Sequence, residues 1–171
     1  MLSAGMQSAI NAQVNAELYS AYLYAAMGMY FESIDMKGAA SWMKVQVQEE
    51  LVHADKFMTY VNDRGGRMVL DAIEKPPVEW ASCLAAFEAA LEHEKKVSSL
   101  IGGLVTLARD EKDHMTDNFL QWFVAEQVEE EASVGEVARK LRLVGGSGGG
   151  VFMIDNELGT RVFTPPVTAQ A

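Results

Sequence analysis

Four long stretches of this chain place apolar residues at alternating steps of three and four, and this pattern constrains the fold more than any other feature. Such spacing is typical of amphipathic helices, which bury one face. The predicted helices span about residues 4–34, 35–64, 82–110 and 115–144, and Asp35 is predicted to cap the second. The sequence therefore predicts an all-α fold built from four long helices.

The connections between these stretches predict how the helices are arranged. The first and second helices are joined by so short a connection that they must be antiparallel neighbours. The third follows a connection from 66 to 81 that contains Pro76-Pro77 and is expected to be extended. About 16 residues at ~3.3 Å each can span up to ~50 Å, whereas a helix of about 30 residues is ~45 Å long. The third helix can therefore run parallel to the second, as in a four-helix bundle with a long crossover between its second and third helices.

The chain beyond the fourth helix is predicted to turn sharply and to form one more helix. The run Gly145-Gly146-Ser147-Gly148-Gly149-Gly150 breaks the fourth helix, and residues 151–158 can form a short fifth one. We expect residues 1–160 to form one domain, a four-helix bundle with a short fifth helix. Residues 161–171 are expected to be a flexible C-terminal tail.

Composition narrows the possible partners. The 171 residues include 14 Lys and Arg against 24 Asp and Glu, a net charge of -10, which argues against nucleic acid because phosphates would be repelled. No window offers the ~18 uncharged apolar residues of a membrane span, so we expect a soluble protein with no membrane partner. The single cysteine, Cys83, cannot close an intrachain disulfide, and the first residues lack the features of a signal peptide. A reducing cytoplasm is therefore the expected location.

One carboxylate interrupts each of the four apolar stripes: Glu17, Glu50, Glu94 and Glu130. His53 lies one helical turn after Glu50, so both side chains can reach one metal ion from the same face. The four glutamates lie roughly 12 to 15 residues into their helices, near the midpoints, and the midpoints of equal helices in a bundle share one layer. Four uncompensated anions gathered there would be highly unfavourable. The sequence therefore predicts that bound metal ions compensate them.

These features together resemble the bacterial non-haem ferritins over residues 1 to about 160. The resemblance is carried by Glu17, Tyr24, the motif Glu50-Leu51-Val52-His53, Glu94, the run from Asn118 to Glu131, and the run from Val151 to Leu158. Glu-x-x-His alone is a weak signal, whereas the set is specific. The resemblance implies a homo-oligomeric shell of 24 subunits, each with a di-iron ferroxidase centre. That centre would oxidise Fe(II) with O2 or hydrogen peroxide and pass Fe(III) to a mineral core.

The resemblance also implies a role for each residue of the centre. Glu17 and His53 would hold the first iron, Glu50 would bridge, and Glu94 with Glu130 would hold the second, with Gln127 beside it. Tyr24 and Trp122 would either donate an electron or a hydrogen bond, or simply fill the core. Glu49, Glu126 and Glu129, with Glu130, resemble a third iron site, although glutamates beside a core stripe are also typical of solvated helix surface.

Departures from related patterns bear on haem and on other histidines. The haem-ligating Met of bacterioferritins follows the bridging glutamate, where this chain has Leu51, so no haem is expected. His93 and His114 lie off the stripes and are predicted to be surface histidines rather than ligands.

The sequence leaves other functions open beside an iron-storing ferroxidase. A di-iron oxidoreductase or peroxidase of the rubrerythrin type is the main alternative, but Gln127 and Glu130 stand where such enzymes carry a second Glu-x-x-His, and no Cys-x-x-Cys is present. A non-catalytic helical module that merely tolerates its glutamates is a third possibility. A DNA-protecting mini-ferritin is disfavoured by the acidic chain and by ligands assigned within one bundle.

Overall fold

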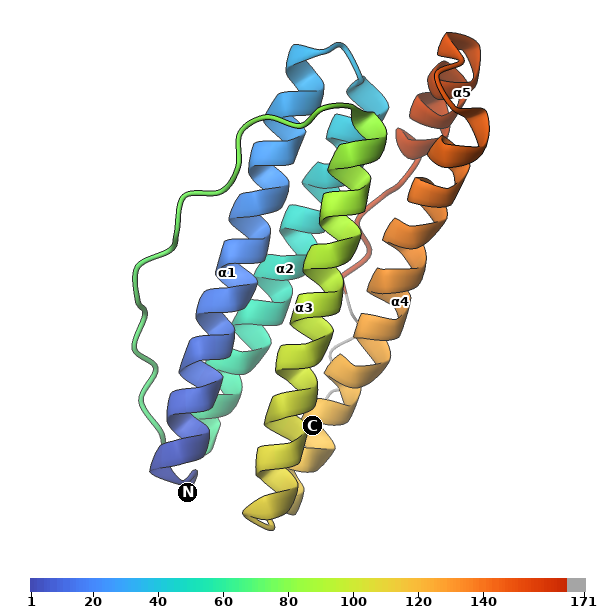
Figure 1. Ribbon diagram of the computed structural model, residues 1–171. Coiled ribbons are helices and arrows are strands. Elements are labelled where there is room, and N and C mark those ends of the chain that lie inside the picture. The colour runs from blue at the N-terminus through green and yellow to red at the C-terminus, as the bar shows by residue number, and fades with distance from the viewer. Residues whose placement is uncertain (166–171) are drawn as a thin grey trace.

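The computed structural model describes residues 1–165, and within that range it contains five helices and no strand. They are α1 (Ala4–Ser33), α2 (Lys37–Asp63), α3 (Cys83–Asp110), α4 (His114–Val144) and α5 (Gly148–Leu158). The first four lie side by side as a bundle, and α5 packs across one end of it against α2 and α4 (Figure 1). The predicted all-α bundle with a short fifth helix is confirmed.

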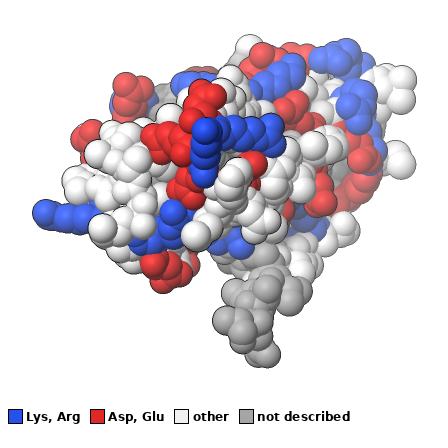
Figure 2. Space-filling view, turned by 90° about the horizontal axis from the view of Figure 1, so that it is seen from below, with Lys and Arg blue, Asp and Glu red and all other residues white. Residues whose placement is uncertain are grey.

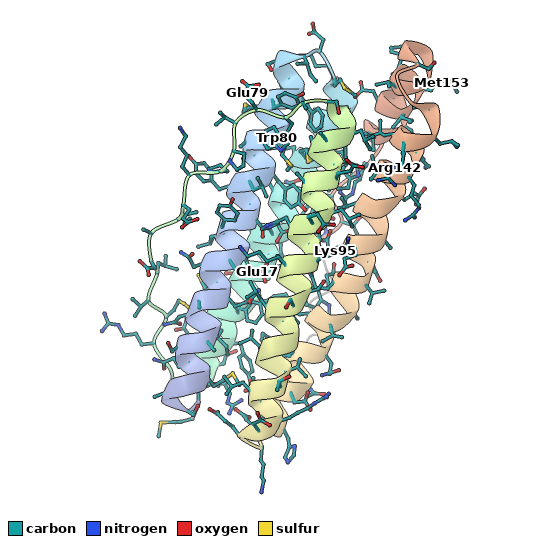
Figure 3. The ribbon with its side chains drawn as sticks, in the orientation of Figure 1. Glu17, Glu79, Trp80, Lys95, Arg142 and Met153 are labelled. Atoms are coloured by element: carbon teal, nitrogen blue, oxygen red, sulfur yellow. The ribbon has the colours of Figure 1, made fainter. Side chains whose placement is uncertain are left out.

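The long crossover is also confirmed. Residues 64–82 follow the outside of α1 along the bundle, so that α2 and α3 run in the same direction (Figure 1). Asn15 on α1 donates to the backbone carbonyls of Asp71 and Ala72, at 3.3 Å and 3.0 Å. Near the start of α3 the indole ring of Trp80 packs edge-on against the Tyr30 ring, with 5.2 Å between centroids (Figure 3). These contacts fix an extended segment that has no helical bonds of its own.

The predicted cap of α2 is wrong. Asp35 has a φ of 59° and lies in the turn, while Met36 occupies the cap position without a side-chain bond. The cap comes instead from α5, where Asp155 Oδ1 accepts from the backbone N–H of Ala39 at 2.8 Å. Gly38 permits this approach, since a Cβ there would meet the Asp155 carbonyl oxygen at 1.6 Å. A residue far along the chain thus satisfies an N–H of the first turn that has no partner within the helix.

The start of α5 also differs from the prediction. The helix begins at Gly148 rather than at residue 151, so three glycines form its first turn. Ser147 caps it, accepting from the backbone N–H of Gly150 at 3.4 Å. A side chain on Gly150 would meet Val144 at 2.7 Å, so the packing of α5 against the end of α4 requires glycine at this position. Packing here overrides the low helix propensity of glycine.

The core consists of two apolar clusters separated by a layer of buried polar residues. The α5-end cluster includes Tyr24, Phe31, Met43, Phe87 and Leu141, and the turn-end cluster, near the α3–α4 turn, includes Ile10, Phe57, Val61, Leu120 and Phe123. Between them lies what we call the polar layer: Gln13, Glu17, Gln46, Glu50, His53, Glu94, Gln127 and Glu130. The predicted stripes are therefore interrupted at one common level of the bundle.

The segment after α5 returns along the bundle toward this layer (Figure 1). Of the predicted tail, residues 161–165 are described, and Arg161 is packed against α2. Residues 166–171 lie outside the described residues. Within residues 1–165, no helix is long and apolar enough to cross a membrane.

Candidate metal centre

The polar layer gathers ionisable side chains from all four long helices. Glu17 of α1, Glu50 and His53 of α2, Glu94 of α3 and Glu130 of α4 are only 1% to 4% exposed. Each glutamate lies near the middle of its helix, as Figure 3 shows for Glu17. Because the apolar stripe of each helix faces the bundle axis, a glutamate within that stripe must face it too. The structure thus buries all five residues that the stripes single out, and the clusters of ligand atoms within 4.8 Å of one another include four of them, all but Glu94.

The first cluster of possible ligands comprises Glu17, Glu50 and His53. One ligand atom from each lies within 4.8 Å of the other two, close enough for all three to hold one ion. Nδ1 of His53 is 3.4 Å from Oε2 of Glu50, as the spacing of one helical turn predicts. Oε2 of Glu17 and Oε1 of Glu50 are buried and have no hydrogen-bond partner among the described residues. Buried carboxylate oxygens without donors are strongly unfavourable, and a metal ion is the partner that fits them.

The second cluster comprises His53, Glu126 and Glu130, again with ligand atoms within 4.8 Å of one another. Nε2 of His53 is 4.0 Å from Oε1 of Glu126. The imidazole therefore has one nitrogen toward each cluster. Glu126 is half-buried and belongs to the residues that the resemblance assigns to a third site.

Glu94 faces the layer from the other side and is held by two donors. The phenol of Tyr24 donates to one carboxylate oxygen, and Nε2 of Gln127 lies 3.3 Å from the other. Gln127 also reaches the hydroxyl of Ser98 at 3.3 Å. Tyr24 and Gln127 therefore contact a predicted ligand, as expected for residues that orient it.

Burial shifts the protonation of this layer. It raises the pKa of Glu17, although His53, Gln13 and Glu50 oppose that shift. It also raises the pKa of Glu50 well above its usual value and the pKa of Glu94 to about 8, and neighbouring carboxylates add to both of these shifts. Burial, with Glu94 close by, also raises the pKa of Tyr24 well above its usual value, so its phenol keeps its proton and remains a donor. Without cations the layer must retain protons; divalent cations can replace them.

Two glutamines of the layer escaped the sequence prediction of site residues. Nε2 of Gln13 donates to Oε1 of Glu17 at 2.8 Å, and Nε2 of Gln46 donates to Oε2 of Glu130 at 2.9 Å. Each lies four residues before a stripe glutamate, Gln13 before Glu17 and Gln46 before Glu50. A buried amide at that spacing is a signal that could have found them.

The residues of the suggested third site differ in how far they are buried. Glu49 and Glu126 are half-buried, whereas Glu129 is exposed. Oε2 of Glu49 lies 2.7 Å from Nη2 of Arg161, an ion pair that the sequence did not predict. Burial raises the pKa of Glu49 to about 7, although Arg161 opposes the shift, and burial also raises the pKa of Glu126.

Trp122, His93 and His114 differ in their surroundings. The indole of Trp122 packs edge-on against His53, with 5.6 Å between ring centroids. His93, predicted to lie on the surface, is half-buried, and its Nε2 is 2.7 Å from the hydroxyl of Ser20. The prediction failed because His93 faces α1, where its ring also packs against that of Tyr19, with 5.6 Å between centroids. His114 is exposed, as predicted.

The end of the bundle at the α3–α4 turn carries mixed charge. Acidic and basic side chains are interspersed on this end, which Figure 2 views directly. Several of the acidic groups are paired, Asp113 with Arg64 at 3.0 Å and Asp117 with Arg109 at 3.3 Å. This arrangement offers phosphates no uniform basic surface on this end.

Comparisons with known proteins give one consistent result. Residues 7–144 match the model of the Ferritin family, described as a ferritin-like domain. The chain is 44% identical over 161 residues to a protein of Bacteroides fragilis named bacterial non-heme ferritin, covering 94% of this chain and all of that protein. It is 40% identical to a probable bacterial non-heme ferritin-like protein of Haemophilus influenzae, over 93% of this chain and 96% of that protein.

Solved structures agree. An engineered closed form of the Archaeoglobus fulgidus ferritin is 54% identical with a TM-score of 0.95, covering 96% of this chain and all of that chain. A structure described as an open pore ferritin from the same archaeon is 53% identical with a TM-score of 0.94, covering 95% of this chain and all of that one.

Proposed function

This chain belongs to the ferritin family of iron-storage proteins, and we propose that it oxidises Fe(II) at a di-iron centre within each subunit and stores the product as hydrated Fe(III) oxide. The membership confirms the resemblance seen in the sequence. The observation that carries the proposal is that four carboxylates and one imidazole are buried in one layer of the bundle. Two of the carboxylate oxygens have no hydrogen-bond donor among the described residues.

We keep the ligand assignment that the resemblance implies. Glu17 and His53 would hold the first iron, Glu50 would bridge, and Glu94 and Glu130 would hold the second. The clustering of Glu17, Glu50 and His53 supports the first assignment. Glu94 and Glu130 face the same layer, and Gln127 keeps the Glu94 carboxylate in place. Four carboxylates also balance the charge of two Fe(II) ions.

The residues present suit oxidation of Fe(II) as the substrate. Hard carboxylate oxygens favour Fe(III) over Fe(II), which makes loss of an electron easier. Two irons held together supply the two electrons that reduce O2 to hydrogen peroxide. Four protons are released as two Fe(II) ions and water become hydrated Fe(III) oxide, in addition to the protons that iron displaces from the raised-pKa carboxyls.

The second iron is expected to be held more weakly than the first. In the proposed assignment its ligands are carboxylates, with the Gln127 amide where related enzymes carry a histidine. A weaker site suits a centre that must pass Fe(III) onward. Tyr24 donates a hydrogen bond to Glu94, which is a ligand of the second iron in this assignment.

A third iron site at Glu49, Glu126 and Glu129, shared with Glu130, stays a prediction of the resemblance. The approach of Glu126 to Glu130 and His53 favours it. The ion pair between Glu49 and Arg161 opposes it in the present arrangement.

We further propose assembly into a shell of 24 subunits that encloses the mineral. The support is likeness of the whole subunit to ferritins, of which one is described as an open pore form and another as an engineered closed form. The same helical subunit is therefore compatible with more than one arrangement of pores.

One experiment tests storage and oxidation together. The purified protein is sized before and after Fe(II) is added under air, while O2 consumption and Fe(III) absorbance are followed. A large particle that consumes O2 rapidly and fills with iron is expected. The double variant Glu50→Ala with Glu94→Ala should lose fast oxidation, while Glu92→Ala, an exposed position on α3, should retain it. A monomer that takes up no iron would overturn the proposal.

A further inference from the structure

Arg161 reaches the metal centre from the segment that follows α5. This segment returns along the bundle after Leu158, and the Arg161 side chain is only 23% exposed (Figure 1). Its guanidinium lies over the Trp42 ring, with 4.4 Å to the centroid. An arginine packed on an aromatic face and largely shielded from water is held more firmly than a surface arginine.

The guanidinium contacts two residues of α2 at once. Nη2 lies 2.7 Å from Oε2 of Glu49, and Nη1 donates to Oε1 of Gln46. Glu49 and Gln46 are one helical turn apart, so a forked donor can reach both. The three contacts, with Trp42 included, fix the position of the positive charge.

Gln46 connects Arg161 with Glu130, a proposed ligand of the metal centre. A guanidinium has only donors, so it must face the carbonyl oxygen of the Gln46 amide. The amide nitrogen then points the other way, where Nε2 donates to Oε2 of Glu130 at 2.9 Å. Arg161 therefore selects the amide orientation that holds one oxygen of a proposed iron ligand.

The same guanidinium forms an ion pair with Glu49, one of the residues of the suggested third site. The four carboxylates of the di-iron centre already balance two Fe(II) ions, and Arg161 balances Glu49. A third Fe(II) would have to bind beside a fixed positive charge with Glu49 already engaged. Glu129 is exposed, so only Glu126 and the shared Glu130 would remain as buried or half-buried carboxylates. Coulomb repulsion and the lost ligand both disfavour that ion.

We propose that Arg161 is a positioning residue that substitutes for a third metal ion: it keeps Glu49 from binding iron and orients Glu130 through Gln46. The inference rests on the proposed function, because it concerns the same centre. It predicts that the chain holds two divalent ions per subunit where a chain without this arginine would hold three.

The test counts bound metal ions rather than turnover. Metal-free protein is titrated with Co²⁺ by calorimetry without O2, and crystals soaked in Co²⁺ are measured for anomalous density. The unaltered chain should bind two ions per subunit, and Arg161→Gln should bind a third, with density beside Glu49. Arg161→Lys keeps the charge and should stay at two. Arg142→Gln is the matched control, since Arg142 pairs with Glu88 far above the layer (Figure 3).

The outcomes separate the two proposals. If neither the unaltered chain nor Arg161→Gln binds ions at Glu50 and Glu94, the di-iron centre itself is wrong. If the unaltered chain binds three ions, or Arg161→Gln binds only two, the centre stands and the role of Arg161 is refuted. Should Arg161→Gln fail to fold, Arg161→Met gives the same comparison, because its unbranched stem can still pack on Trp42.

Discussion

The two apolar clusters and the polar layer between them make opposite contributions to the stability of the bundle. In the turn-end cluster, Phe57 and Phe123 stack with 4.0 Å between ring centroids, and every contact gains from the removal of apolar surface from water. In the polar layer, burial raises the pKa of Glu50 and Glu94, which means that the folded chain resists their charge. The clusters therefore stabilise the fold, and the layer lowers stability until cations enter it.

This difference explains why the layer lies at mid-height. A costly group at the end of a bundle would let the helices fray, whereas here both neighbouring clusters hold the helices together across it. The stability that the two apolar clusters supply thus offsets the unfavourable burial of carboxylates in the polar layer. Such a locally unfavourable arrangement is typical of functional sites.

Truncation within the turn-end cluster should have the largest effect. Phe123→Ala removes a buried ring that packs on Phe57 and is expected to cost about 3–5 kcal/mol of unfolding free energy. Urea unfolding of the metal-free protein measures it. Leu143→Ala on the same helix, at a side chain 87% exposed, should change stability by less than about 0.5 kcal/mol. Equal losses in the two variants would show that the cluster does not supply the stability assigned to it.

The metal-free protein should lose stability as pH rises. Glu94 has a folded pKa of about 8, whereas an unfolded glutamate titrates near 4.5, so the folded state binds more protons between these values. Unfolding free energy should fall on the order of 3 kcal/mol from about pH 5 to about pH 8 and then level off. Thermal melts across this range, with and without Zn²⁺, measure the effect. Zn²⁺ should flatten the slope, and a metal-free protein that gains stability over this range would contradict the prediction.

A neutral isostere in the layer should stabilise the metal-free chain. Glu94→Gln removes a buried charge while keeping the side-chain shape, so at about pH 8 it should raise the unfolding free energy by about 2 kcal/mol, with little effect near pH 5. The same variant should bind Zn²⁺ more weakly, because a ligand is lost. Glu92→Gln, on the exposed face of α3, should do neither. A destabilised Glu94→Gln at pH 8 would mean that the carboxylate is compensated within the chain.

The sequence predicted the helices and the layer because both depend on local periodicity. A stripe at helical spacing predicts the buried face, and a glutamate within it predicts a buried carboxylate, as found for Glu17 and Glu130. The cap of α2 could not be predicted in this way, because Asp155 comes from the other end of the chain. The contact of Arg161 with Gln46 was missed for the same reason. Residue 161 follows the last helix, where no repeat indicates which side chain turns inward.

Tyr24 belongs to both regions and gives the finest test of the comparison. Its ring lies in the α5-end cluster, while its phenol donates to Glu94 in the polar layer. Tyr24→Phe keeps the ring and removes the donor, so the metal-free protein should lose about 1 kcal/mol, the usual net value of one hydrogen bond. Because this bond lowers the pKa of Glu94, its loss should raise that pKa further and move the upper end of the pH slope above about pH 8. Thermal melts of the variant over pH measure both changes. If Tyr24 served only to fill the core, the ring alone would suffice, and neither the stability nor the pH at which the slope ends would change.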